Sequence, residues 1–122
     1  KRGWKLSRIS FIKATRNELT FYGAFDRESL IGVIATKNEG KHISLFFIKP
    51  SYHRRGIGKQ LFKTAILNQP VSEMTVNSSS YAIPIYRKLG FEPVCEEQVT
   101  HGMKYTPMKR MGTKVRELEK VC

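Results

Sequence analysis

A short basic segment with two glycines constrains the fold more than any other part of the chain. It reads Ser-Tyr-His-Arg-Arg-Gly-Ile-Gly-Lys over residues 51–59 and is here called the glycine loop. Before it lies an apolar run at residues 42–48, and after it apolar residues recur at helical spacing as far as Pro70. The junction therefore predicts a strand that turns tightly into a helix, as in proteins that mix α and β elements.

The rest of the chain predicts further strands and helices in the order strand, strand, strand, helix, strand, helix, strand, strand. Strands are expected at residues 19–25, 30–36, 42–48, 71–76, 91–99 and 103–108, and helices at residues 56–69 and 80–89. Because residues 42–48 become apolar on both faces, we expect a central strand that is buried on both sides. Residues 1–18 show no clean period and predict a short helix or an irregular lead-in. The charged tail, residues 109–122, has helix-like spacing, and we expect it to dock weakly or not at all.

The chain has 122 residues, of which 40% are hydrophobic, and this predicts one domain with one core over residues 1–122. Its formal net charge of +12 predicts attraction to polyanions such as nucleotide cofactors, nucleic acid or anionic lipid. No apolar run approaches the ~20 residues that cross a bilayer. Two cysteines form at most one bridge, so we expect reduced thiols and a soluble cytoplasmic protein. We assign no metal site.

The glycine loop has the chemistry of a phosphate site. The first N–H groups of a helix have no internal partner and the helix dipole is positive there, so an anion binds at that end. Glycine lets a ligand approach the backbone, and Arg54, Arg55 and Lys59 add attraction. A purely structural reading is also open, because strand-to-helix turns use glycine generally. The glycine spacing fits neither a Walker loop nor a Rossmann fingerprint.

The loop resembles the acetyl-CoA loop of the GNAT superfamily, which is written Gln/Arg-x-x-Gly-x-Gly/Ala between a strand and a helix. This chain has His53-Arg54-Arg55-Gly56-Ile57-Gly58 in that place, with His53 where the family usually has Gln or Arg. The resemblance implies that backbone amides of the loop hold the pyrophosphate of acetyl-CoA, the co-substrate. It assigns to this site His53, Arg54, Arg55, Gly56, Ile57, Gly58 and Lys59.

A second stretch resembles the family's other motif, an Asn after a strand, then an Ala and a Tyr-x-x-Leu-Gly-Phe helix end. Residues 76–82 and 85–91 carry it. The resemblance implies that Asn77 and Ala82 contact acetyl-CoA and that Tyr86 protonates the leaving thiolate as a general acid. Alternatively, Asn77 caps the helix and Tyr86 is a core aromatic.

The resemblance also implies that a backbone N–H of the central strand, near Phe47 or Ile48, polarises the thioester carbonyl. The base that deprotonates the acceptor is less well marked. Many relatives place a Glu on this strand, but here His42 is the nearest titratable residue, and Glu39, Glu73 and Glu97 are weaker candidates. The strand and helices with which family members usually begin are largely missing.

The sequence thus predicts a GNAT-like α/β (α+β) fold with a mixed, mostly antiparallel sheet flanked by helices. The expected function is N-acetyl transfer from acetyl-CoA to a primary amine of an unidentified acceptor by direct attack on the thioester. Two alternatives remain, a non-catalytic acyl-CoA-binding module and a basic nucleic-acid-binding protein. No base-reading motif supports the second, so a nucleic-acid partner is not expected. Exposed edge strands make a homodimer a further expectation.

Overall fold

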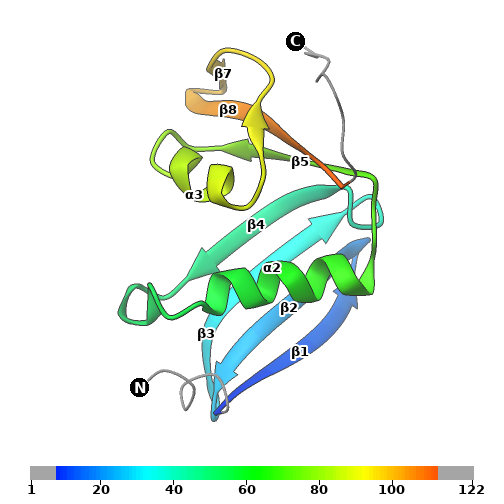
Figure 1. Cartoon of the computed structure of the whole chain (residues 1–122), viewed down its shortest axis with the longest axis vertical. Coiled ribbons are helices and arrows are strands. Elements are labelled where there is room, and N and C mark those ends of the chain that lie inside the picture. Colours follow the sequence, from blue (N-terminus) through cyan, green and yellow to red (C-terminus); the bar gives the residue numbers. More distant parts are fainter. Residues whose placement is uncertain (1–7, 113–122) are drawn as a thin grey trace. The chain divides into compact units, whose positions relative to one another are not determined.

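The computed structural model describes residues 8–112, which form two compact units that divide after Pro70 (Figure 1). The first unit contains β1 (Ile9–Arg16), β2 (Leu19–Asp26), β3 (Ser29–Lys37), β4 (His42–Ile48), the 3-10 helix η1 (Pro50–Tyr52) and α2 (Ile57–Asn68). The second contains β5 (Glu73–Ser78), α3 (Ile83–Lys88), β6 (Glu92–Pro93), β7 (Gln98–Thr100) and β8 (Met103–Met111). Within each unit the strands pair antiparallel, which confirms the predicted mixed fold with a mostly antiparallel sheet.

In the first unit, β1, β2, β3 and β4 lie side by side in chain order (Figure 1). Two-residue turns set the register of the first two pairs. Asn17 and Glu18 both have positive φ, 51° and 67°, as a type I′ hairpin turn requires. Arg27 has a φ of 62° in the turn between β2 and β3. These turns place each strand next to the one that precedes it in the chain.

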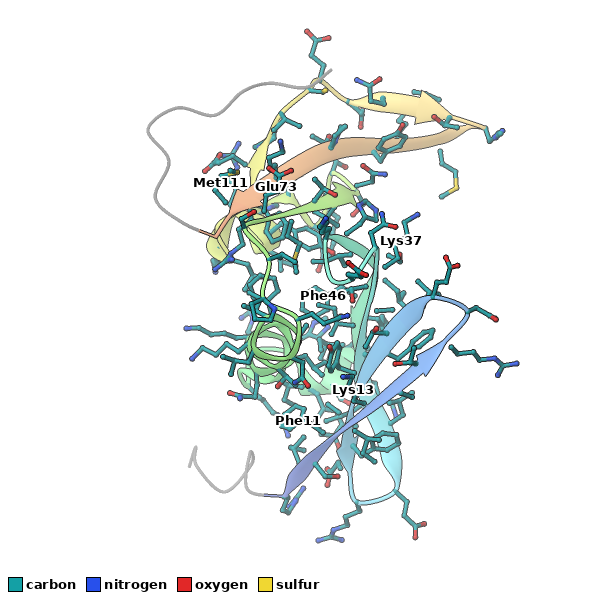
Figure 2. All side chains as sticks on the ribbon, turned by 90° about the vertical axis from the view of Figure 1, so that its right-hand side faces the viewer. Phe11, Lys13, Lys37, Phe46, Glu73 and Met111 are labelled. Carbon is teal, nitrogen blue, oxygen red and sulfur yellow. The ribbon has the colours of Figure 1, made fainter. Side chains whose placement is uncertain are left out.

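One face of this sheet is covered by α2, which packs on β2, β3 and β4 (Figure 1). The helix buries Ile57, Leu61, Phe62 and Ala65. At its C-terminal end the Gln69 side chain accepts from the Tyr22 and Thr36 hydroxyls at 3.5 and 3.4 Å. Figure 2 shows the side chains that fill the space between helix and strands. The apolar residues that recur at helical spacing in the sequence are therefore those that α2 buries against the sheet.

The opposite face of the sheet corrects one prediction. We expected β4 to be buried on both sides, but Leu45 and Phe47 are 46% and 54% exposed. The side chains of Phe46 and Ile48 lie toward α2, next to Gly58, whereas alternation turns Leu45 and Phe47 the other way. Among the described residues of the first unit, no helix covers that second face.

The N-terminal strand corrects a second prediction. Residues 9–16 form β1 rather than a helix or an irregular lead-in, and they pair along their whole length with β2. The strand is at the edge of this sheet, and only Ile9 is buried in it. A strand that buries so little on either face shows no alternation of apolar and polar residues, so its sequence lacks the period that marks a half-buried strand. Residues 1–7 lie outside the described residues.

In the second unit, β8 pairs with β5, β6 and β7. The last two predicted strands meet in a hairpin of β7 and β8, with φ of 52° at His101 and 78° at Gly102 in the turn. Glu73 and Met111 are register partners and lie side by side in Figure 2. The core of the unit is apolar and consists of Met74, Val76, Tyr86, Phe91, Val94 and Met108.

Four boundaries in this unit differ from the prediction, beginning with β5, which spans Glu73–Ser78 rather than residues 71–76. The expected strand at 91–99 is two short strands, β6 and β7, because residues 94–97 leave the extended pairing. The second helix is shorter than expected, and Pro84 lies in its first turn. Residues 109–111 continue β8, while residues 113–122 of the expected tail lie outside the described residues. Among the helices described, none is long and apolar enough to cross a membrane.

Two leucines on α2 test how far the first unit depends on this packing. Leu61 is fully buried, whereas Leu67 is 79% exposed on the same helix. We expect Leu61→Ala to lower the free energy of unfolding by about 2–5 kcal/mol, because it removes buried methyl groups and leaves a cavity. Leu67→Ala is expected to change it by less than about 0.5 kcal/mol. Urea unfolding measures the free energy of both variants, and equal losses of stability would contradict the observed packing of α2.

Candidate functional site

The glycine loop leads into an exposed helix N terminus. Gly56 is the N-cap of α2 in the left-handed conformation, with φ 81° and ψ 5°, and no side chain caps the helix. The first intrahelical bond is donated by the Gln60 N–H to the Gly56 carbonyl at 3.0 Å. The N–H groups of Ile57, Gly58 and Lys59 come before this first bond, so they donate none within the helix. A Cβ added to Gly56 would meet nothing within 4 Å, so the space beside these amides is open.

Two further contacts fix the loop before Gly56. The Nε2 of His53 donates to the Ile48 carbonyl at the end of β4, over 2.8 Å. The His53 N–H donates to the Pro50 carbonyl at 3.1 Å. Arg54 then adopts a left-handed φ of 65°, which is costly for a residue with a side chain. The His53 ring therefore connects the loop to the sheet, a role that the sequence did not indicate.

The three cations of the glycine loop are exposed, and its second glycine lies against the sheet. Arg54, Arg55 and Lys59 are all exposed, so their charges face solvent at the start of α2. Ile57 is buried, and it can offer a ligand only its backbone. A Cβ on Gly58 would lie 3.5 Å from Ile48, an ordinary contact. The structure thus brings the predicted loop residues together around one helix end.

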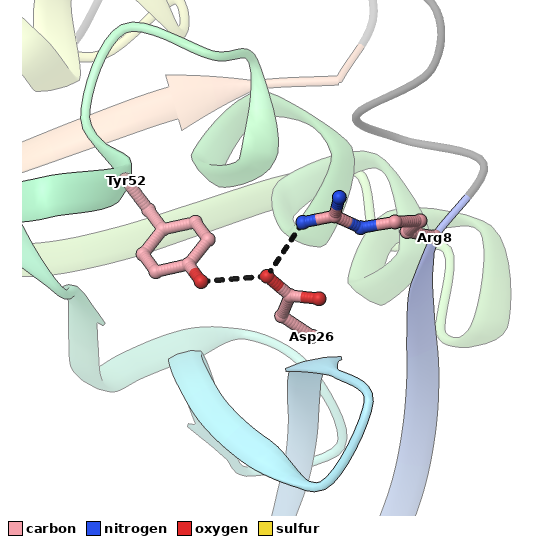
Figure 3. Close-up of polar contacts among 3 residues, drawn as sticks. All are labelled: Arg8, Asp26 and Tyr52. Carbon is pink, nitrogen blue, oxygen red and sulfur yellow. Dashed lines mark hydrogen bonds and ion pairs between the residues drawn. The ribbon is translucent and has the colours of Figure 1, made fainter.

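Tyr52 lies within the glycine loop and bonds to Asp26 at the end of β2, and sequence reasoning assigned neither residue a role. The Tyr52 hydroxyl donates to Asp26 Oδ2 at 2.6 Å, and Arg8 donates to the same oxygen at 3.1 Å (Figure 3). The guanidinium of Arg55 lies 5.0 Å from the centre of the Tyr52 ring. They border an open cavity of about 600 Å³, lined by Arg8, Asp26, Arg27, Glu28, Ser29 and Tyr52. The one available signal for this contact in the sequence was Tyr52, an aromatic residue inside a basic loop.

The candidate residues of β4 differ in their environments. Phe47 and Ile48 pair with Val33 and Gly32 of β3. His42 begins the strand and is half-buried, and burial, with a smaller effect of Lys37, holds the pKa of its imidazole below the ordinary 6.5. The ring is therefore neutral at pH 7 and able to accept a proton.

The weaker base candidates gain no support from their surroundings. Glu73 forms an ion pair with Lys109 in the second unit, with 3.6 Å between the charged atoms. Glu39 lies in the turn between β3 and β4 and has a φ of 59°, and Glu97 is exposed in the segment before β7. Among these candidates, only His42 is partly buried.

Tyr86 lies in α3 of the second unit and is buried. Its ring meets Phe91 edge to face, with 5.5 Å between ring centres and 72° between planes. The Phe91 N–H donates to the Tyr86 carbonyl and the Gly90 N–H to the Arg87 carbonyl, each over 3.0 Å. With Gly90 at φ 100°, this is a Schellman motif closed by its apolar contact. Burial raises the pKa of Tyr86 to about 12.

Asn77 and Ala82 lie on either side of the turn into α3. Asn77 is exposed on β5, and the cap-like bond to the Ala82 N–H comes from the Ser79 hydroxyl at 3.2 Å. No side chain caps α3, so of the two roles left open for Asn77, helix capping is not the one seen here. Ala82 precedes α3, and its carbonyl accepts from the Tyr86 N–H at 3.0 Å. The second motif is thus assembled locally around α3.

Comparisons with known proteins agree on one family. The acetyltransferase (GNAT) domain model matches residues 7–111. A curated relative, the uncharacterized N-acetyltransferase YafP of Escherichia coli K12, is 36% identical over 58 residues, which are 48% of this chain and 37% of that protein. The chain therefore matches well under two thirds of this relative's length.

Solved structures share the fold. The PaiA N-acetyltransferase from Thermoplasma acidophilum, in complex with coenzyme A, is 25% identical, with 77% of this chain and 61% of that one covered at a TM-score of 0.60. A GNAT family acetyltransferase from Elizabethkingia anophelis with acetyl-CoA bound is 17% identical, with 85% and 98% covered at a TM-score of 0.63. With the family match extending over most of its length, this chain belongs to the GNAT acetyltransferase family.

Proposed function

We propose that this protein is an N-acetyltransferase that takes the acetyl group of acetyl-CoA and transfers it to a primary amine. One observation carries the proposal, the open N terminus of α2 at Gly56, with exposed cations on both sides of it. The coenzyme A complex of the PaiA relative supports the choice of donor. The acceptor is an amine because the family transfers acetyl groups and relatives are named N-acetyltransferases.

The glycine loop fits a pyrophosphate in chemistry and in space. Amides of Ile57, Gly58 and Lys59 precede the first helical bond, so they are donors at the positive end of the helix dipole. The empty space around a Gly56 Cβ leaves room for an anion against the backbone. Arg54, Arg55 and Lys59 would then add charge, and His53 would hold the loop to β4 rather than contact the ligand through Nε2.

Transfer requires a proton for the departing sulfur, and Tyr86 is proposed to donate it. The amine nitrogen bonds to the thioester carbonyl carbon, the carbon–sulfur bond breaks, and the thiolate takes up the phenolic proton. A phenol with a pKa of about 12 keeps its proton at pH 7, so Tyr86 acts as a donor and not as a base. An N–H of Phe47 or Ile48 is the proposed partner of the carbonyl oxygen, and Asn77 and Ala82 are the proposed contacts of the pantetheine arm.

The proton released by the amine needs an acceptor, and His42 is the proposed base. A primary ammonium of ordinary pKa is protonated at pH 7, so it must lose a proton before it attacks. His42 is neutral there because its pKa lies below 6.5. The attacking nitrogen loses a second proton as the amide forms. Of the two protons that leave the nitrogen, one replaces the proton that Tyr86 gives to the sulfur and the other is released to solvent.

Substitution of Gly56 tests the binding half of the proposal. Gly56→Glu places a side chain and a negative charge at the open helix end, and we expect the Kd for acetyl-CoA to rise at least about tenfold in calorimetric titration. Gly102→Glu is the matched control, because Gly102 also has a positive φ, 78°, and open space around its Cβ. Both variants carry the same backbone strain, so equal affinities would contradict the assignment of the loop.

Substitution of Tyr86 tests catalysis. Tyr86→Phe keeps the edge-to-face contact with Phe91 and removes only the proton donor. We expect kcat to fall by about 10²–10⁴-fold while the Kd for acetyl-CoA is unchanged. Release of the CoA thiol, screened against a diamine, an aminoglycoside and a lysine peptide, measures the rate. Binding without turnover by the unaltered chain would instead indicate a non-catalytic acyl-CoA-binding module.

The pH profile tests the role of His42. A base must be unprotonated, so the rate is expected to rise with pH as His42 loses its proton and to level off near its lowered pKa, below 6.5. His42→Asn should remove this acid limb and reduce the rate on the plateau. His101→Asn, in the exposed turn before β8, should leave the profile as it is. An unchanged pH profile in His42→Asn would show that another group is the base.

A further inference from the structure

A buried carboxylate on β2 directs both of its hydrogen bonds through one oxygen. Asp26 ends β2 and is only 9% exposed. Its Oδ2 accepts from Tyr52 at 2.6 Å and from Arg8 at 3.1 Å (Figure 3). Its Oδ1 is buried without a hydrogen-bond partner among the described residues. A buried acceptor without a partner costs free energy, and the two bonds to Oδ2 help to offset that cost.

The bond between Asp26 and Tyr52 has the character of a charge-assisted hydrogen bond. The distance of 2.6 Å is in the range of O–H···O⁻ bonds. Hydrogen bonding to Tyr52, then to Arg8, holds the pKa of Asp26 below its ordinary 3.8. The same bond to Asp26 is the main cause that raises the pKa of Tyr52 above 10.0. Near pH 7, Asp26 is therefore ionised and Tyr52 is the donor.

Tyr52 lies near the start of the glycine loop and transmits this restraint to the loop residues that follow it. It ends η1, where its N–H donates to the Lys49 carbonyl at 2.8 Å. The guanidinium of Arg55 lies 5.0 Å from the centre of the Tyr52 ring, in the geometry of a cation–π contact. A phenol that donates to a carboxylate becomes richer in electrons, which strengthens the attraction of its ring for a cation. Arg55 in turn immediately precedes Gly56, the N-cap of α2.

We propose that Asp26 and Tyr52 are positioning residues that hold Arg55 and the glycine loop in the shape that receives a pyrophosphate. This inference rests on the proposed function, because the ligand is the pyrophosphate of acetyl-CoA. It assigns part of the loop's rigidity to a residue of β2 that lies outside both motifs. Neither residue contacts the reacting atoms in this role, so the effect is on donor binding and not on the chemical step.

Graded variants of Tyr52 separate its two contacts. Tyr52→Phe removes the bond to Asp26 and keeps the ring beneath Arg55, whereas Tyr52→Leu removes both. Tyr105→Phe is the matched control, because its phenol lies 3.3 Å from the Thr100 hydroxyl in the hairpin of β7 and β8. Two quantities are measured for each variant, amide hydrogen exchange at residues 53–60 and the Kd for acetyl-CoA by calorimetry.

For Tyr52→Phe we expect loop amides to exchange about tenfold faster and the Kd for acetyl-CoA to rise about threefold to tenfold, with a larger rise in Tyr52→Leu. The kcat at saturating acetyl-CoA should be unchanged. The KM for S-acetylpantetheine, which has no pyrophosphate, should also be unchanged. A general loss of structure would alter that value as well. Tyr105→Phe should match the unaltered chain in every measurement.

The possible outcomes separate this inference from the proposed function. Unchanged loop exchange in Tyr52→Phe overturns the inference, and so does faster exchange with an unchanged Kd for acetyl-CoA. If the unaltered chain does not bind acetyl-CoA, the proposed function fails, and the exchange data alone then decide whether the pair orders the loop. If Tyr52→Phe does not fold, Asp26→Asn takes its place. Asn keeps an acceptor for Tyr52 without the charge, and an exchange rate equal to that of the unaltered chain would overturn the inference.

Discussion

The packing of α2 on the strands of the first unit is the constraint on which the rest of the candidate site depends. Ile57, the first residue of the helix, is buried, so the helix must begin against the sheet rather than in solvent. The chain leaves β4 at Ile48 and has only residues 49–56 in which to reach that point. The turn is therefore tight, and it is completed by Gly56 in a left-handed conformation that glycine adopts without strain.

The parts of the fold that could be read from the sequence are those set by local pattern. Helical spacing gave the buried face of α2, and short turns between apolar runs gave β2, β3 and the hairpin of β7 and β8. The edge strand β1 was missed because it buries only Ile9 and carries no period. The burial of β4 was overestimated because apolar residues on two faces do not reveal which face a helix covers, and here Phe47 is left half exposed.

The same distinction applies to the candidate site. The loop from His53 to Lys59 and the turn around Tyr86 are each continuous in sequence, so motifs locate them and the local backbone explains them. The pair formed by Asp26 and Tyr52 depends on tertiary structure, because the two residues belong to separate elements, β2 and η1. No spacing rule connects two residues 26 positions apart. Residues that position a site are therefore harder to predict than residues that compose it.

Backbone strain in the glycine loop explains why several contacts hold it in place. Arg54 and Gly56 both have positive φ, on either side of Arg55, and a residue with a side chain holds that conformation only where its surroundings impose it. Three contacts do so, the His53 bond to the Ile48 carbonyl, the Tyr52 bond to Asp26 and the burial of Ile57. Exposed cations alone would attract any polyanion, since net charge acts at long range without geometry. A loop whose shape is fixed before binding would lose less conformational entropy when an anion arrives, so under the proposed function its amides, rather than its charge, would select the ligand.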